Sequence, residues 1–223
     1  MAKIGILMAM QKERELFSAF LQNMIPVTLR QNTFYRGEYG SHQLTIVVSG
    51  MGKVNAALAT ATLIEKFDCE IIINIGISGG LDSSLNIGDI VVGQDIVYHD
   101  VWCGEPNAYG QIQGLPLIFH SAPELVALVK SYPKVLLCCG DKFISQNAEL
   151  MNIKSIFPSA MAVDMESGAI AHTCYLYNTK LLVIRQISDT PGVEHHIEQY
   201  NNFWLNAPQN SITLVRQILE LIK

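Results

Sequence analysis

The chain has 223 residues, of which 49% are hydrophobic and 16% are charged. This composition excludes a disordered chain, and the length allows a sizeable core without stabilising crosslinks. The formal net charge of −5 argues against binding to nucleic acid, because a groove that reads phosphates is usually basic. The simplest organisation is one α/β domain over residues 1–223.

The first apolar run is short and meets Lys12 and Glu13 at once, so we expect a core strand there and not a secretory signal. No stretch approaches the roughly 18 apolar residues of a membrane span. The odd number of cysteines and the absence of CxxC indicate reduced thiols in a cytoplasmic protein. The 195–198 segment, His-His-Ile-Glu, lacks the spacing of a metal site, so we expect no metal or other cofactor.

Short apolar runs alternate with stretches of helical spacing along the chain. The expected strands are 4–10, 44–48, 71–75, 89–92, 135–138, 160–163 and 181–184. Several of them are continuously apolar, as in strands covered on both faces. Helical spacing opens at Lys53, returns over 168–177 and continues as a C-terminal stripe from Ile212 to Ile222. The pattern predicts an α/β fold with a central, mostly parallel or mixed twisted sheet flanked by helices.

Polar, acidic and glycine residues follow these runs in chain order. They are Glu13, Ser49–Lys53, Gly76–Gly80, Tyr98–Asp100, Gly140–Phe143, Asp164–Ser167 and Arg185–Asp189. Turns and helix caps would explain any one cluster. In open α/β sheets, ligands bind beyond the carboxyl ends of the strands. Because the clusters recur after successive runs, we predict a small-molecule site at that edge.

The glycine-rich clusters do not match the common nucleotide-binding motifs. A Walker loop would need Gly at the position of Val47 and Ser or Thr at that of Val54. The 76–80 segment is not GxGxxG. It allows either close approach of the backbone to a ligand or a tight turn between a strand and a helix.

No GxSxG motif is present, so the chemistry is expected to depend on carboxylates. Glu13, Asp164, Glu166 and Asp189 all follow predicted strands. A carboxyl in an apolar pocket has a raised pKa and can donate a proton, whereas an ionised one can take a proton from water. This arrangement is typical of a hydrolase whose leaving group must be protonated.

The motifs, in their order, resemble those of the 5′-methylthioadenosine/S-adenosylhomocysteine nucleosidases of the nucleoside phosphorylase superfamily. They are Ile4–Glu13, Ser49–Val54, Asn74–Leu81, Gly88–Val92, Tyr98–Asp100, Ala162–Ser167 and Arg185–Asp189. Met-Glu-Ser followed by Ile-Ser-Asp is specific for the superfamily, and the segment around Glu13 narrows it to the hydrolase branch. The resemblance runs from residue 4 to about 205, and the C-terminal helix also fits.

The resemblance implies hydrolysis of the N-glycosidic bond of methylthioadenosine, S-adenosylhomocysteine and 5′-deoxyadenosine. The products would be adenine and the 5′-substituted ribose, in methionine salvage and the recycling of S-adenosylmethionine by-products. Asp189 would protonate N7 of adenine, with Ser188 orienting it. Glu13 would activate the attacking water, with Arg185 steadying Glu13.

The same resemblance implies the substrate contacts. Glu166 would bind the ribose hydroxyls, with Met165 under the sugar. Phe143 would stack on adenine, and the backbone of Ile144 would read its edge. The other implied contacts are Ser78 and Gly79 beside the ribose and the water, Ile77 in the same loop, and Tyr200, Phe203, Met10 and Met51 around the 5′ substituent.

The sequence also departs from the family pattern. Ile77 stands where many relatives have a small polar residue, and Asp164 replaces a common Glu, so its role is open. Gln113 stands where Pro is common, and the 101–108 segment is slightly shorter. In the family, the 101–113 segment reaches the 5′ pocket of the neighbouring subunit, which implies a homodimer.

Three alternatives stay open. A nucleoside phosphorylase would need several cationic groups around phosphate, and the 76–80 segment has no Arg or Lys. An aminofutalosine nucleosidase could use the same catalytic groups. A non-catalytic nucleoside-binding module would keep Phe143 and Glu166 but would not need both Glu13 and Asp189.

Overall fold

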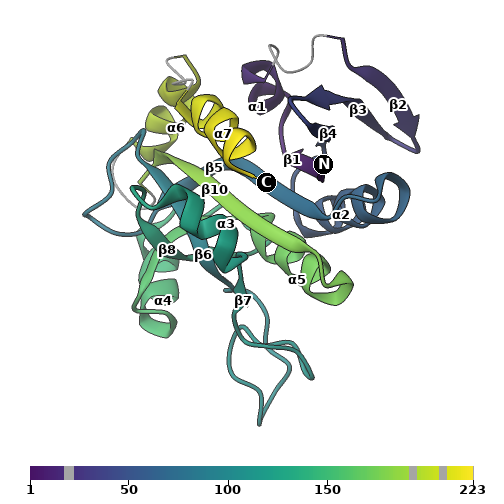
Figure 1. The fold of residues 1–223 in the computed structure, drawn as a ribbon. Helices are drawn as coiled ribbons and strands as arrows, with labels where there is room; N and C mark the ends of the chain where they lie inside the picture. Colours follow the sequence, from purple (N-terminus) through teal and green to yellow (C-terminus); the bar gives the residue numbers. More distant parts are fainter. Residues whose placement is uncertain (18–22, 191–194, 206–209, 223) are drawn as a thin grey trace.

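The computed structural model describes residues 1–17, 23–190, 195–205 and 210–222. Within these ranges the strands are β1 (Lys3–Met8), β2 (Ile25–Leu29), β3 (Asn32–Tyr39), β4 (His42–Val48), β5 (Ile71–Gly80), β6 (Ile90–Tyr98), β7 (Phe119–His120), β8 (Lys134–Cys139), β9 (Ala160–Asp164) and β10 (Lys180–Asp189). The helices are α1 (Gln11–Leu16), α2 (Lys53–Phe67), α3 (Pro123–Val126), the 3-10 turn η1 (Ala127–Val129), α4 (Asn147–Ile156), α5 (Ser167–Tyr177), α6 (His196–Leu205) and α7 (Asn210–Leu221). Figure 1 shows their arrangement.

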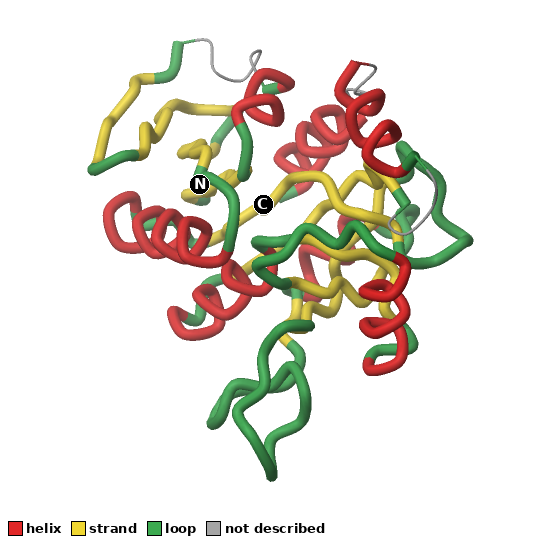
Figure 2. The backbone as a smooth tube through the Cα atoms, turned by 180° about the vertical axis from the view of Figure 1, so that it is seen from behind, coloured by secondary structure: helices red, strands yellow, loops and turns green. Residues whose placement is uncertain are grey.

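One mixed sheet takes strands from the whole length of the chain. Its order is β10-β6-β8-β9-β5-β1-β4-β3-β2, with β7 paired to β6. β10 also pairs with β5, so β10, β6, β8, β9 and β5 form a closed ring. The β1–β4, β1–β5, β5–β10, β6–β8 and β8–β9 pairs are parallel. The predicted mixed α/β sheet is confirmed, while the antiparallel β2–β3 hairpin was not predicted (Figure 2).

The apolar strands are buried on both faces because their side chains alternate between two cores. Ile72 and Val183 pack with residues of α2 and α5. Their neighbours Ile73 and Leu182 pack with residues of α3 and α7 on the other face. Alternation of this kind needs apolar residues at every position, which explains the continuous apolar runs.

Two of these strands are longer than their apolar runs. β5 and β10 continue beyond Ile75 and Ile184, and their parallel pairing persists through Arg185 and Gly76. The 76–80 segment is therefore part of a strand, which excludes the tight-turn interpretation. In these strand ends Arg185 donates to Asn74 and Ser188 donates to Asp189, whereas Ser78 Oγ has no partner among the described residues.

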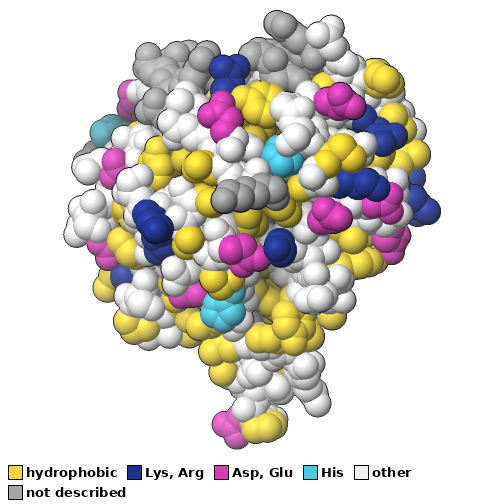
Figure 3. All heavy atoms as spheres, viewed as in Figure 1, with side chains coloured by type: hydrophobic (Ala, Val, Ile, Leu, Met, Phe, Trp, Pro, Cys, Tyr) yellow, Lys and Arg dark blue, Asp and Glu magenta, His cyan; other side chains and the backbone are white. Residues whose placement is uncertain are grey.

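The segment between β6 and β7, residues 99–118, projects from the body of the molecule. Trp102 within it is 62% exposed. On the face shown in Figure 3, basic and acidic side chains are interspersed and no large basic patch is present. Within the described ranges, none of the helices has the length and apolar character that crossing a bilayer requires.

Candidate active site

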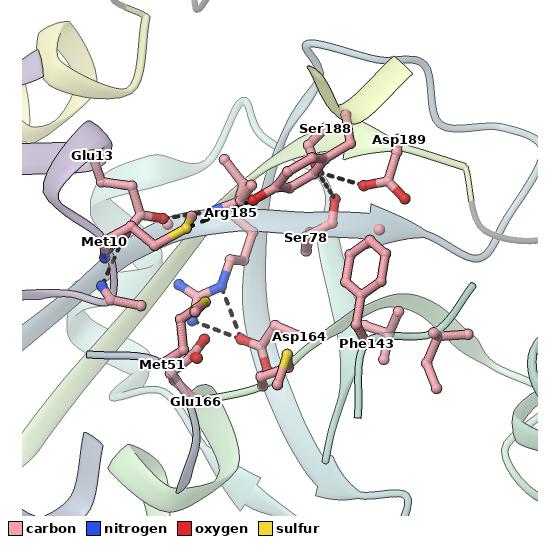
Figure 4. Close-up of a pocket in the computed structure, with 18 of the residues that line it drawn as sticks. Met10, Glu13, Met51, Ser78, Phe143, Asp164, Glu166, Arg185, Ser188 and Asp189 are labelled. Carbon is pink, nitrogen blue, oxygen red and sulfur yellow. Dashed lines mark hydrogen bonds and ion pairs between the residues drawn. The ribbon is translucent and has the colours of Figure 1, made fainter. Parts of the chain in front are cut away.

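A cavity lies where the carboxyl ends of β1, β5, β9 and β10 come together (Figure 4). Nearly all of the predicted site residues line it: Met10, Glu13, Met51, Ile77, Ser78, Gly79, Phe143, Ile144, Met165, Glu166, Arg185, Ser188, Asp189 and Tyr200. Phe203 does not line it. Its side chain is buried one turn further along α6, with its ring 5.5 Å from that of Trp204. The proposed contact of Phe203 with the 5′ substituent is therefore not part of this cavity.

Glu13 enters the cavity from the first turn of α1. Its Oε2 accepts hydrogen bonds from the backbone N–H groups of Ala9 at 2.9 Å and Met10 at 2.8 Å, and its Oε1 accepts one from Ile77 at 3.2 Å. Burial raises the pKa of Glu13, while these donors and the charge of Arg185 oppose the rise. A fixed carboxylate with a raised pKa is a stronger base than a free one, which suits it to take a proton from water.

Arg185 contacts a different acid from the one expected. Its Nη2 lies 2.6 Å from Asp164 Oδ2 and donates to Asn74 Oδ1 at 2.6 Å. The described atoms of Arg185 and Glu13 form no direct hydrogen bond, but the charge of Arg185 lowers the pKa of Glu13. The departure at Asp164 has a clear role: this carboxylate pairs with Arg185 and also accepts from Ser167 Oγ at 2.8 Å.

Asp189 lies at the opposite end of the cavity from Glu13. The side chain of Ser188 donates to Asp189 Oδ1 at 2.6 Å, whereas Oδ2 has no hydrogen-bond partner among the described residues. The residue is 1% exposed, and burial raises its pKa. With Oδ1 occupied as an acceptor, the proton of a neutral Asp189 belongs on Oδ2, the free oxygen.

Glu166 is held from the other side of the cavity. Its Oε1 accepts a hydrogen bond from the backbone N–H of Gly52 at 2.8 Å. Gly52 has φ +90°, a conformation that side chains rarely adopt. Burial, followed by the charge of Asp164, raises the pKa of Glu166 to about 7. The glycine in the loop after β4 thus places a backbone N–H against the carboxyl group of Glu166.

Aromatic and sulfur-containing side chains close the cavity. The rings of Phe143 and Tyr200 meet edge to face, with centroids 5.8 Å apart. Tyr200 OH lies 3.7 Å from Met10 Sδ, which joins α6 to the loop after β1. Phe143 and Met51 are 45% and 61% exposed, so their faces are open to a ligand. The arrangement is apolar with a few directed polar groups, as is usual for small-molecule sites.

Three lining residues have roles that the sequence did not predict, although Gly76 and Lys142 lie in clusters expected at this edge. Asn74 anchors Arg185, and its own side chain donates to Leu7 O at 3.1 Å. Gly76 is needed because a Cβ there would lie 2.9 Å from Glu13 Oε1. Lys142 lines the cavity and pairs with Glu149. The sequence feature that could have indicated Asn74 was a single amide residue inside an apolar strand.

Within the described part of the chain, His, Cys, Asp and Glu form no cluster that could hold a metal ion.

Glu13 and Asp189 therefore face one cavity from its two ends, each buried and each held by different partners. A base and an acid on opposite sides of a bound molecule can cleave one bond between them: the base activates water and the acid protonates the leaving group.

The comparisons with known proteins agree with this geometry. The model of the phosphorylase superfamily matches residues 3–220. The 5′-methylthioadenosine/S-adenosylhomocysteine nucleosidase of Staphylococcus haemolyticus is 36% identical, covering 98% of this chain and 100% of that protein. The S-adenosylhomocysteine nucleosidase of Streptococcus pyogenes, solved with 5-methylthiotubericidin, superimposes with a TM-score of 0.93 at 35% identity over 100% of this chain and 98% of that one.

Futalosine hydrolase of Helicobacter pylori also superimposes with a TM-score of 0.93, at 25% identity over 99% of this chain and 98% of that one.

The match to the superfamily model and to the Staphylococcus haemolyticus nucleosidase confirms the resemblance seen in the motifs over nearly the whole length of the chain. The chain belongs to the phosphorylase superfamily and, within it, to the 5′-methylthioadenosine/S-adenosylhomocysteine nucleosidase family.

Proposed function

We propose that this protein hydrolyses the N-glycosidic bond of 5′-methylthioadenosine and S-adenosylhomocysteine, and also of 5′-deoxyadenosine. The products are adenine and the 5′-substituted ribose. The observation that carries the proposal is the placement of Glu13 and Asp189 at the two ends of one cavity in a chain of this family. The names of its relatives supply the substrate class.

Asp189 is the proton donor in this proposal. Cleavage of the C1′–N9 bond is easier when adenine leaves as a neutral molecule, so N7 must receive a proton. The raised pKa and the unpartnered Oδ2 of Asp189 suit it to this step. Ser188 keeps the carboxyl group in one orientation through the hydrogen bond to Oδ1.

Glu13 is the base that activates water. As the bond breaks, positive charge develops on the ribose, and a water molecule beside Glu13 attacks C1′. The negative carboxylates of Glu13 and Glu166 stabilise this developing positive charge electrostatically. Glu166 would accept hydrogen bonds from the ribose hydroxyls, and Met10, Met51 and Tyr200 would surround the apolar 5′ group.

A phosphorylase is less well supported. Phosphate would need free cationic groups, and the two cations among the described lining residues are already paired, Arg185 with Asp164 and Lys142 with Glu149. The match to futalosine hydrolase favours cleavage of aminofutalosine as the second candidate, because the same acid and base could serve both substrates.

A homodimer is part of the proposal. Exposed apolar residues lie on α2 and α5, which pack against each other: Leu58, Tyr175 and Leu176 are 52%, 53% and 63% exposed. The projecting 101–113 segment would complete the 5′ pocket of the partner subunit. Three further parts of the proposal concern the whole protein. The free cysteines support a cytoplasmic location. The continuous sheet supports one nucleosidase domain over residues 1–223, and the reaction would serve methionine salvage.

The direct test is an assay of free base. The purified protein is incubated with methylthioadenosine, S-adenosylhomocysteine, 5′-deoxyadenosine, adenosine, inosine and aminofutalosine, each with and without phosphate. We expect adenine release from the 5′-thio nucleosides at a rate that does not depend on phosphate. A requirement for phosphate would identify a phosphorylase, and a preference for aminofutalosine would identify the second candidate.

The same assay tests the two carboxyls. Asp189→Asn removes the proton donor but keeps the shape, and Glu13→Gln removes the base, so each should lower kcat by roughly 10²–10⁴-fold. Substrate binding by the Asp189→Asn variant, measured by calorimetry, should be largely retained. Adenine release near the wild-type rate in either variant would show that its assigned role is wrong.

A further inference from the structure

The start of α2 is held by carboxylates from two other segments. Its N-cap residue, Gly52, has no side chain that could cap the helix. Instead, the backbone N–H of Gly52 donates to Glu166 Oε1 at 2.8 Å, and that of Lys53 donates to Asp141 Oδ1 at 2.7 Å. The N-terminus of a helix attracts negative charge, so both acids lie where the helix favours them. Figure 4 shows Glu166 beside Met51, the residue before Gly52.

Asp100, two residues after β6, connects the two ends of this arrangement. Its two carboxyl oxygens each accept a hydrogen bond from Lys53 Nζ at 2.9 Å, and its Oδ2 also accepts the backbone N–H of Asp141 at 2.8 Å. Because the N–H of Lys53 binds Asp141 in turn, these three residues form a closed ring of hydrogen bonds. Gly140 allows the close approach, since a Cβ there would lie 2.9 Å from Asp100 Cγ.

Stability alone does not account for this ring. The side chains of Lys53, Asp100 and Asp141 are 21%, 27% and 49% exposed. Ion pairs with such access to water contribute little to the free energy of unfolding. The ring does, however, fix the loops after β4, β6 and β8 relative to one another, and two of these loops carry residues that line the cavity. Its geometry is that of a device for positioning.

We propose that Asp100 is a positioning residue for Glu166. Through Lys53 and Asp141 it fixes the first turn of α2, so the N–H of Gly52 stays against Glu166 Oε1 and holds the carboxyl group in one orientation. A carboxylate that accepts hydrogen bonds from ribose hydroxyls needs such a fixed orientation. Asp100 is absent from the described lining residues, so it acts through Glu166. The inference rests on the proposed function, which gives Glu166 its role.

The test compares methylthioadenosine with its 3′-deoxy analogue, which lacks one of the hydroxyls assigned to Glu166. In Asp100→Ala, kcat/KM for methylthioadenosine should fall roughly tenfold, the scale of one weakened hydrogen bond to a charged group. For the 3′-deoxy analogue it should fall less than about threefold, because one of the contacts is already missing. An equal loss for both nucleosides would overturn the proposal and indicate that the ring places the segment before Phe143 instead. Unchanged kinetics would overturn it as well.

A second substitution identifies the route. Lys53→Met keeps the aliphatic stem but removes the charge, and it should cause the same selective loss as Asp100→Ala. The double variant should lose no more than either single variant, because both residues act through one ring. Additive losses would show that the two residues act separately and would contradict the proposed route.

Glu124→Ala on α3 is the matched control. Glu124 pairs with Lys180 Nζ at 3.0 Å, at the start of β10 and thus at the opposite end of that strand from Asp189. This variant removes a comparable ion pair away from the cavity, so it should keep kcat/KM for both nucleosides. Selective loss in this control would contradict a specific role for Asp100.

Two further results complete the test. The Tm of Asp100→Ala should fall by no more than about 4 °C, since the lost ion pair is partly exposed. Asp100→Asn keeps the shape and one acceptor oxygen, so it should show a smaller loss with the same selectivity, also where the Ala variant does not fold. A wild-type protein that cleaves no nucleoside would overturn the proposed function together with this inference. Normal wild-type cleavage with unselective Asp100 variants would overturn this inference alone.

Discussion

Three carboxyl groups, those of Glu13, Asp164 and Glu166, lie near the single buried arginine of the site, Arg185. Arg185 is 1% exposed and pairs directly with Asp164, while Glu13 and Glu166 feel its charge without an ion pair. A single buried cation cannot compensate three buried negative charges. The pKa values of Glu13 and Glu166 are accordingly raised, mainly by burial. We infer that the site stores unfavourable charge that a ribose cation could relieve.

The unfavourable burial of negative charge at the site should make the free energy of unfolding depend on pH. The pKa of Glu166 is about 7 in the folded protein, against an ordinary value of 4.5. The folded state therefore binds the proton of Glu166 more tightly than the unfolded state does. As a consequence, the free energy of unfolding falls as the pH rises from about 4.5 to about 7. Glu166→Gln should therefore raise the free energy of unfolding at pH 8 by up to about 3 kcal/mol, and by less at pH 5.

Urea denaturation of both proteins at the two pH values measures this difference. The Gln variant should also lose ribose binding, so higher stability and lower activity are expected together. An equal stability change at pH 5 and pH 8 would show that the Glu166 carboxyl is not the titrating group.

Among the elements, β5 is the one that brings the site together. Its residue Gly76 pairs in parallel register with Arg185 on β10. Glu13 from α1 lies over this pair, and the missing side chain of Gly76 leaves the space that both groups occupy. Because Gly76 has no side chain, β5 allows the carboxylate of Glu13 and the guanidinium of Arg185 to approach each other.

Gly76→Ala should therefore remove activity. The added Cβ would lie 2.9 Å from Glu13 Oε1 and displace the carboxylate, so we expect kcat to fall on the order of 100-fold, the scale of losing a positioned base. The matched control is Gly37→Ala on β3, whose Cβ would lie 2.8 Å from Met24 Cγ, a flexible side chain far from the site. Adenine release by both variants is the measurement, and near-normal activity of Gly76→Ala would contradict the proposed placement of Glu13.

For the whole molecule, the proposed homodimer would explain both the projecting segment and the exposed apolar residues of α2 and α5. Soluble monomers rarely expose contiguous apolar surface without a partner to cover it. Phe119, the first residue of β7 directly after the projecting segment, has its ring 5.7 Å from that of Tyr175 on α5. The segment and the helices therefore adjoin, as parts of one interface between two copies would.

Light scattering tests this interface. The wild-type protein should have the mass of a dimer, and Leu58→Glu on α2 should yield a monomer, because an unpaired charge is costly in an apolar contact. Its activity should fall with the mass if the partner subunit completes the 5′ pocket. Met151→Glu on α4, at a residue 61% exposed on the other side of the molecule in Figure 1, is the control. A wild-type monomer would contradict the dimer.

The sequence by itself determined the fold class and most of the cavity lining. Continuous apolar runs followed by polar clusters predict both, because strand burial and the carboxyl edge of a sheet follow from local pattern. The motif order also identified the family, since Glu13, Glu166 and Asp189 each stand in a recognisable segment.

Only the tertiary structure decided which groups pair. Asn74, Asp164 and Arg185 are far apart in the chain, and their contacts depend on the order of β5, β9 and β10 in the sheet. The placement of Phe203 outside the cavity likewise depends on how α6 packs. Local pattern determines which side chains reach an edge, whereas distances between those side chains are set by strand order and packing.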